Sequence, residues 1–260
     1  MMPGDVTHHA GNKGICMSPQ QNRGQSKLFG ALFIPALLIG AFIVIAILVM
    51  SFTGSERATP RPGDGPTTVD AGVMNQLRNQ YDKLAEAKGN PNAPVTIREF
   101  GDYQCPACGA FEPTAERIRK EYVDTGKVRF LFYDFPLPMH QHAQAAAVAA
   151  RCAAAQNDFW PFHNRLYQTQ GQWSEQNDPT SMFLDLAVET GLDTNKLKAC
   201  MNKETPLAQI NAERDAGQAV SLRATPTVMV GDTLFVGGPS YDKLKTAIDE
   251  ALAAAGNNGQ

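Results

Sequence analysis

The sequence CPAC places two cysteines, Cys105 and Cys108, three positions apart. A C-x-x-C pair can open and close a disulfide, and the same spacing also occurs in structural zinc sites. Zinc sites usually combine two such pairs, whereas the other cysteines, Cys16, Cys152 and Cys200, are isolated in the sequence. We therefore predict dithiol–disulfide exchange at Cys105 and Cys108, with no metal or other cofactor.

The residues around this pair predict where each sulfur lies. Val95–Phe100 alternates like a β-strand, and a helix is expected from Pro106 to about Tyr122. The unpaired N–H groups and the dipole at a helix N-terminus favour a thiolate, and C-x-x-C sites lower the cysteine pKa to roughly 3.5–7.5. We predict that Cys105, at the helix entrance, attacks, and that the shielded Cys108 resolves the mixed disulfide.

The rest of the chain predicts a small mixed sheet with helices on its faces. Residues 128–132 are expected to form a second strand, and a long block to about residue 222 has helical character. Two further strands meet at Gly231-Asp232, a strong turn signal, and an amphipathic helix follows at residues 241–252. The fold class is therefore α/β.

A second motif, Thr225-Pro226, opens the third expected strand. With it, the sequence resembles the DsbA-like branch of the thioredoxin superfamily over about residues 90–256. The resemblance rests on VTIREFGDYQCPACGAFEP (Val95–Pro113), on Thr225-Pro226, and on the gap of roughly 118 residues between Cys108 and Pro226, which a helical insertion at about residues 138–222 would fill.

The resemblance implies a thioredoxin-like fold and three further site residues. Pro226 would be cis, Thr225 would present its backbone to substrate beside Cys105, and Glu99 would lie beneath the redox pair and relay the proton of Cys108. The alternatives are a solvated charge for Glu99 and an ordinary strand-opening proline for Pro226. The Pro-Ala dipeptide lacks the histidine of the strong oxidants in this family, so thiolate stabilisation is expected to rest mainly on the helix terminus.

Cys152 and Cys200 both lie in the expected helical block, 48 residues apart. In an oxidising compartment two buried thiols in one subdomain usually pair, and relatives in the family carry a similar second bond, so we predict a structural disulfide. A second redox relay or two free thiols are the alternatives. The histidines at 140, 142 and 163 are interpreted as capping or packing residues.

Leu28–Met50 contains 23 residues without a charge, about 35 Å as a helix and long enough to span a bilayer. Lysine and arginine number three before this span and two just after it, which favours a cytoplasmic N-terminus at residues 1–27. Residues 51–90 are interpreted as a linker carrying a short amphipathic helix over 71–88, and residues 91–256 as the extracytoplasmic domain. The net charge of −3, without a basic run, argues against nucleic-acid binding.

These features predict a membrane-anchored protein disulfide oxidoreductase. It would donate the Cys105–Cys108 disulfide to reduced, unfolded secreted proteins. By the resemblance, a DsbB-like or vitamin K epoxide reductase-like membrane protein would reoxidise it. The alternatives are a thioredoxin-like reductase for cytochrome or metalloprotein maturation and a non-catalytic metal- or peptide-binding chaperone.

Overall fold

A computed structural model describes residues 65–257, and the predicted membrane span at 28–50 lies outside the described residues. Within the described part, no helix is both long and apolar enough to cross a membrane. The strands form one six-stranded sheet in the order β1-β6-β5-β3-β4-β2. Their bounds are β1 Thr67–Thr68, β2 Glu86–Lys88, β3 Val95–Gly101, β4 Val128–Asp134, β5 Thr227–Val230 and β6 Thr233–Val236.

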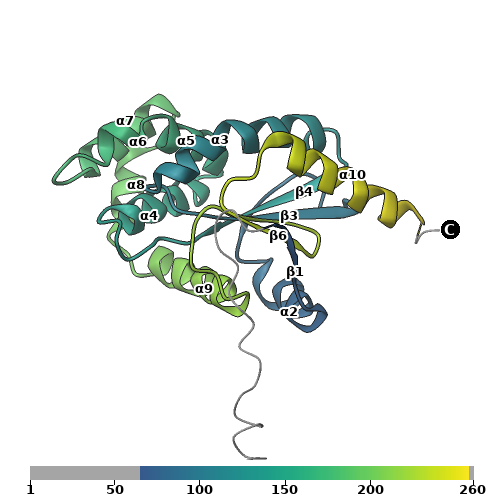
Figure 1. The fold of residues 1–260 in the computed structure, drawn as a ribbon. Coiled ribbons are helices and arrows are strands. Elements are labelled where there is room, and N and C mark those ends of the chain that lie inside the picture. Colours follow the sequence, from purple (N-terminus) through teal and green to yellow (C-terminus); the bar gives the residue numbers. More distant parts are fainter. Residues whose placement is uncertain (1–64, 258–260) are drawn as a thin grey trace, which may run out of the picture. The chain divides into compact units, whose positions relative to one another are not determined.

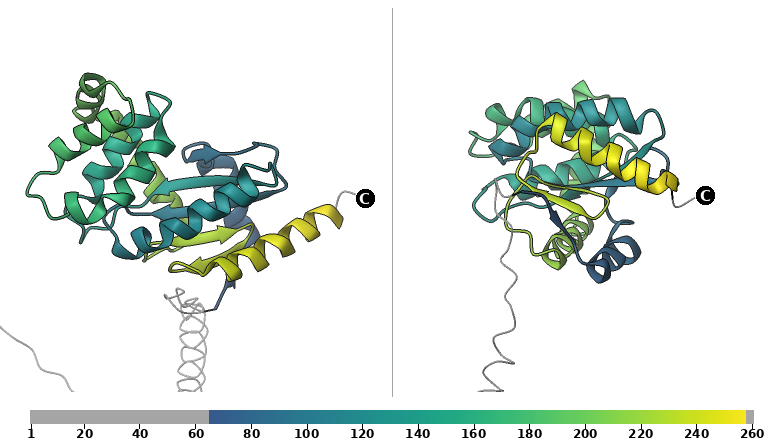
Figure 2. Two further views of the ribbon diagram at one scale, coloured as in Figure 1. Left: turned by 90° about the horizontal axis from the view of Figure 1, so that it is seen from above. Right: turned by 45° about the vertical axis from the view of Figure 1, so that its right-hand side comes forward.

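The helices cover both faces of this sheet and continue beyond one end of it (Figure 1). Their bounds are α2 Ala71–Gln76, α3 Pro106–Ile118, α4 Ala143–Ala154, α5 Phe159–Gln168, α6 Gln170–Trp173, α7 Thr180–Glu189, α8 Thr194–Met201, α9 Thr205–Ala219 and α10 Tyr241–Asn257, with π-helical turns η1 Leu77–Tyr81 and η2 Arg119–Val123. Helices α3 and α10 lie on one face, and α2 and α9 lie on the other (Figure 1). The helices α4 to α8 form the block beyond the end of the sheet, seen from above in Figure 2.

Strand β3 is central because β4 pairs with it in parallel and β5 pairs with it antiparallel. Both of its faces are covered, so the strand is buried along almost its whole length. Ile97 belongs to the core beneath α3, and Phe100 belongs to the core on the opposite face. This arrangement buries the strand that leads into the CPAC turn and fixes the position where α3 begins.

The predicted elements from β3 onward are present. The hairpin turns at Gly231-Asp232, and Gly231 has a φ of +60°, a conformation that glycine adopts without steric cost. The expected helical block corresponds to α4–α9, residues 143–219.

The N-terminal boundary of the domain differs from the prediction. The expected linker at residues 51–90 and helix at 71–88 include β1, α2, η1 and β2, of which β1 pairs with β6 and β2 pairs with β4. Met74 and Leu77 are fully buried against the sheet. The folded domain therefore begins well before residue 91, because strands at both edges of the sheet come from this segment.

Candidate functional site

Cys105 occupies the N-cap of α3, immediately after the loop that follows β3. Its carbonyl oxygen accepts hydrogen bonds from the backbone N–H groups of Cys108 at 3.0 Å and Gly109 at 3.1 Å. Pro106 follows at the first helical position, where its missing N–H has no intrahelical partner to lose. Cys105 is 7% exposed and Cys108 is 0% exposed, so only the first sulfur faces the surface.

The two thiols differ strongly in acidity. The pKa of Cys105 is lowered to about 5, chiefly by a hydrogen bond with the Cys108 side chain. Hydrogen bonds with Thr225 and with the backbone amides of Cys108 and Ala107 lower it further, whereas burial raises it. Burial, with the adjacent Cys105, raises the pKa of Cys108 well above its ordinary value. Cys105 is therefore the thiolate at neutral pH. The sequence predicts the helix terminus as the main cause, whereas the largest single contribution comes from the Cys108 thiol, and each of the two helix amides contributes less.

Thr225, which precedes Pro226, lies directly against the Cys105 sulfur. The peptide bond between the two residues is cis, and the Cys105 Sγ lies 3.4 Å from the Thr225 carbonyl oxygen. The two residues connect α9 to β5, and Thr225 is 120 positions from Cys105 in the chain. The fold thus brings the backbone of Thr225 against the Cys105 sulfur from a distant segment of the chain.

Glu99 is fully buried on β3, on the sheet face beneath α3. Neither carboxyl oxygen has a hydrogen-bond partner in the described part of the protein. Burial first, and then the negative charge of Glu112, raises the pKa of Glu99 to about 8, while Arg119 acts in the opposite direction. Glu99 is thus mostly protonated at neutral pH, and the alternative of a solvated surface charge is wrong.

Tyr167 of α5 is buried next to both Glu99 and the redox pair. Its hydroxyl has no hydrogen-bond partner among the described residues. Burial raises its pKa well above the ordinary value, and the nearby charges of Cys108 and Glu99 are the next causes. Tyr167 is therefore a second buried polar group without a hydrogen-bond partner in the described part of the protein, near both Glu99 and Cys108.

Asp102 and Gln170 also contact the redox turn, although no sequence motif pointed to them. Asp102 donates its backbone N–H to the Cys108 Sγ at 3.5 Å, and Gln170 Nε2 donates to the carbonyl oxygens of Tyr103 at 2.6 Å and Cys105 at 2.9 Å. Gln170 comes from α6, 65 residues after Cys105. A contact between segments this far apart leaves no local pattern in the sequence.

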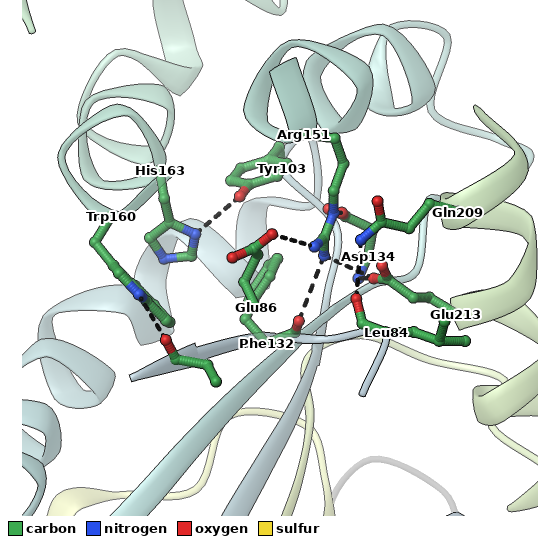
Figure 3. Close-up of polar contacts among 11 residues, drawn as sticks. Leu84, Glu86, Tyr103, Phe132, Asp134, Arg151, Trp160, His163, Gln209 and Glu213 are labelled. Atoms are coloured by element: carbon green, nitrogen blue, oxygen red, sulfur yellow. Dashed lines mark hydrogen bonds and ion pairs between the residues drawn. The ribbon is translucent and has the colours of Figure 1, made fainter. Parts of the chain in front are cut away.

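Of the three histidines among the described residues, His142 and His163 lie in or next to the helical block and pack there. His163 lies between aromatic rings, with its Nδ1 2.9 Å from the Tyr103 hydroxyl (Figure 3). Its Nε2 lies 3.4 Å from a carboxyl oxygen of Glu112. His142, at the N-cap position of α4, contacts the Gln176 carbonyl oxygen at 2.7 Å. The third, His140, contacts the carboxylate of Asp102 instead.

Two features hold the helical block together and against the sheet. Cys152 and Cys200 form a disulfide that joins α4 to α8, with a Cα–Cα distance of 5.6 Å. Next to it, the buried Arg151 bridges carboxylates from three elements, which Figure 3 shows converging on the guanidinium: Asp134 of β4, Glu213 of α9 and Glu86 of β2.

Residues 65–257 contain no cluster of three or more histidine, cysteine, aspartate or glutamate side chains arranged to hold a metal ion. The site that the geometry does define is an exchange site: a low-pKa thiolate at a helix N-terminus, a shielded partner thiol, and a peptide segment across the opening. This combination on a mixed sheet is that of a thioredoxin-like thiol–disulfide oxidoreductase.

Comparison with known proteins agrees with this class. A family model described as "Thioredoxin" matches residues 85–250. Disulfide bond formation protein D of Bacillus subtilis is 31% identical over 171 residues, which cover 63% of this chain and 75% of that protein. The crystal structure of oxidised BdbD from Bacillus subtilis superposes with a TM-score of 0.60 at 31% identity, covering 66% of this chain and 94% of that one.

The crystal structure of Wolbachia pipientis alpha-DsbA1, at 21% identity, shares the fold with a TM-score of 0.62 over 68% of this chain and 94% of that one. The chain therefore belongs to the thioredoxin family and is a DsbA-like thiol–disulfide oxidoreductase that serves disulfide bond formation.

Proposed function

We propose that the enzyme donates the Cys105–Cys108 disulfide to reduced, unfolded secreted proteins outside the cytoplasm. The observation that carries this direction of exchange is the lowered pKa of Cys105, about 5, beside a buried Cys108. A stabilised thiolate favours the reduced form of the enzyme, which makes its disulfide a better oxidant, a relation for which DsbA itself is the known example.

The exchange proceeds in two displacements. A substrate thiolate attacks the Cys105 Sγ, the bond between Cys105 and Cys108 breaks, and Cys108 leaves with the electron pair and then takes up a proton. A second substrate thiolate attacks the substrate sulfur of the mixed disulfide, and Cys105 leaves as a thiolate. The substrate dithiol loses two electrons, and the enzyme gains them.

Glu99 is the residue to which we assign transfer of the proton to Cys108. Its carboxyl group is buried, unpaired among the described residues and protonated at neutral pH, with a pKa of about 8. Protonating Cys108 after it leaves prevents the shielded sulfur from attacking the mixed disulfide again. The backbone of Thr225, 3.4 Å from the Cys105 Sγ, is positioned to pair with the extended substrate beside Pro226.

The cellular setting is part of the proposal. The apolar span at residues 28–50 would anchor the enzyme in the cell membrane with the catalytic domain outside, where secreted proteins acquire disulfides. A DsbB-like or vitamin K epoxide reductase-like quinone reductase in the same membrane would restore the enzyme disulfide. Fractionation of cells that express the full chain, or the chain without residues 28–50, tests the anchor: only the full chain should sediment with membranes.

The reduction potential of Cys105–Cys108, measured against glutathione, tests the direction of exchange. We expect a value above about −200 mV, and a value near that of thioredoxin, about −270 mV, would identify a reductase instead. Cys105→Ser should abolish oxidation of reduced, unfolded ribonuclease, while Cys108→Ser should accumulate mixed disulfides. Faster iodoacetamide labelling of Cys108 than of Cys105 at mildly acidic pH would contradict these roles.

A further inference from the structure

The side chain of Asp102 lies fully buried beneath the redox turn. One carboxyl oxygen accepts the backbone N–H of Gln104 at 2.8 Å. The other accepts the backbone N–H of Leu137 at 2.8 Å and lies 2.7 Å from the Nδ1 of His140. Asp102 therefore ties the redox turn to the connection between β4 and α4.

The backbone of the same residue contacts the segment that carries both redox cysteines. The Asp102 carbonyl oxygen accepts the N–H of Cys105 at 3.1 Å, and the Asp102 N–H donates to the Cys108 Sγ at 3.5 Å. Any shift of Asp102 therefore changes the distance between its N–H group and the shielded sulfur.

His140 supplies the one side-chain contact among the three described partners of this carboxylate; the other two are backbone amides. Its side chain is 20% exposed and turns inward, whereas its neighbour Met139 is 73% exposed. A buried carboxylate that loses one of its partners is left partly unsatisfied and must shift or admit water. The contact with His140 therefore helps to fix Asp102 in place.

The position of Asp102 matters most at the moment when Cys108 leaves the enzyme disulfide. The Cys108 Sγ then carries the electron pair of the broken S–S bond, in a site with little water. A hydrogen bond to an ionised sulfur is stronger than one to a neutral thiol, so an N–H group that already faces the sulfur favours its departure. The Asp102 N–H donates this hydrogen bond and keeps its proton.

We propose that His140 is a positioning residue for disulfide exchange: through its contact with the Asp102 carboxylate, it holds the Asp102 N–H against the Cys108 Sγ and so promotes departure of Cys108. The inference rests on the proposed exchange at Cys105–Cys108 and adds a residue from the β4–α4 connection to it. It does not depend on whether the enzyme acts as an oxidase or a reductase.

The test compares variants of His140 in the full chain, with reduced glutathione as the attacking thiol. In His140→Ala we expect the rate constant for opening the Cys105–Cys108 disulfide to fall about tenfold. The equilibrium constant with glutathione should shift less, about threefold towards the oxidised enzyme or about 15 mV in potential, because the reduced Cys108 is a neutral thiol that accepts a weaker hydrogen bond. His140→Asn should recover most of both, because its amide N–H occupies the place of Nδ1.

Two controls separate positioning from a general loss of structure. His142→Ala alters the same connection but removes a contact to Gln176, so it should leave both constants within about twofold of the wild type. His140→Gln carries an amide that reaches beyond the Nδ1 position, so it should behave like the alanine variant. If His140→Ala does not fold, the comparison between His140→Asn and His140→Gln provides the same test.

Wild-type constants in His140→Ala would overturn the proposal, as would an equal loss in His142→Ala or equal values for His140→Asn and His140→Gln. These outcomes are independent of the direction of exchange in the proposed function. A wild-type reduction potential near that of thioredoxin would refute the oxidase direction, and the rate and equilibrium constants of the His140 variants could still be compared.

Discussion

The acidity of Cys105 predicts how the stability of the reduced enzyme depends on pH. The pKa of Cys105 is about 5 in the folded protein, against 9.0 for an unperturbed cysteine. Between these values the folded state carries a thiolate while the unfolded state keeps its proton. The contribution of Cys105 to the free energy of unfolding of the reduced enzyme should therefore rise as the pH increases from about 5 towards 9, and the oxidised enzyme serves as the reference from which it is measured.

The size of the effect follows from the width of this interval. Well inside this interval each pH unit contributes about 1.4 kcal/mol; from about pH 5, where the folded-state thiol is half ionised, to about pH 7 the increment is about 2.3 kcal/mol for a fully shielded sulfur. Cys105 lies at the surface opening of the site, where water screens its charge, and we take about half of that value, roughly 1–1.5 kcal/mol. The oxidised enzyme has no titrating thiol at Cys105 and should lack this increment.

Urea unfolding of the reduced and oxidised enzyme at about pH 5 and about pH 7 measures the difference. Cys105→Ser, compared in the reduced state, is the matched control and should remove the increment, because serine does not titrate in this range. The ultraviolet absorbance of the thiolate gives the pKa directly. A thiolate that appears only above about pH 8, or an increment that persists in Cys105→Ser, would refute the reasoning.

Three further predictions concern the surrounding structure. The Cys152–Cys200 disulfide should survive dithiothreitol concentrations that reduce Cys105–Cys108, as peptide mapping would show. Replacing Cys152 and Cys200 by alanine should lower the free energy of unfolding by at most about 4 kcal/mol and leave exchange intact, and slower exchange would contradict a purely structural role. The pKa of Glu99 is raised from 4.5 to about 8, so the stability that Glu99 contributes is lost as the pH rises through that interval. Compared with the wild type, Glu99→Gln should therefore be more stable to urea by up to about 3 kcal/mol at pH 7, equally stable near pH 4.5, and slower in exchange. Equal urea stability of the two proteins at pH 7 would contradict this. Arg151→Met should lower the free energy of unfolding by about 3–5 kcal/mol, since it leaves buried carboxylates without their cation, and a loss below about 1 kcal/mol would count against the network.

Local features of the sequence determined the elements that carry the chemistry. The alternation at Val95–Phe100 and the CPAC turn predicted a strand followed by a helix with Cys105 at its start, and both are present. The Gly231-Asp232 turn predicted the hairpin, which the structure contains. Such signals succeed because strand alternation, helix N-termini and two-residue turns depend on neighbouring residues.

The edges of the sheet could not be predicted in the same way. The strands β1 and β2 are two and three residues long and pair with β6 and β4, far away in the chain. Strands this short show no periodic pattern, and the apolar spacing from Val73 to Leu84 predicts a helix over residues 71–88, which includes β2. Only the assembled sheet shows that these residues belong to the domain.

The same distinction between local sequence signals and tertiary contacts applies to the chemistry of the site. The sequence by itself predicted which two thiols exchange, because helix-entrance position and C-x-x-C spacing are local properties. The tertiary structure decided that the Cys108 thiol makes the largest single contribution to the lowered pKa of Cys105, and that Glu99 faces the buried side. It also placed Asp102 and His140, 38 residues apart, in contact. Burial and hydrogen bonds between distant segments set these properties, and both exist only once the chain has folded.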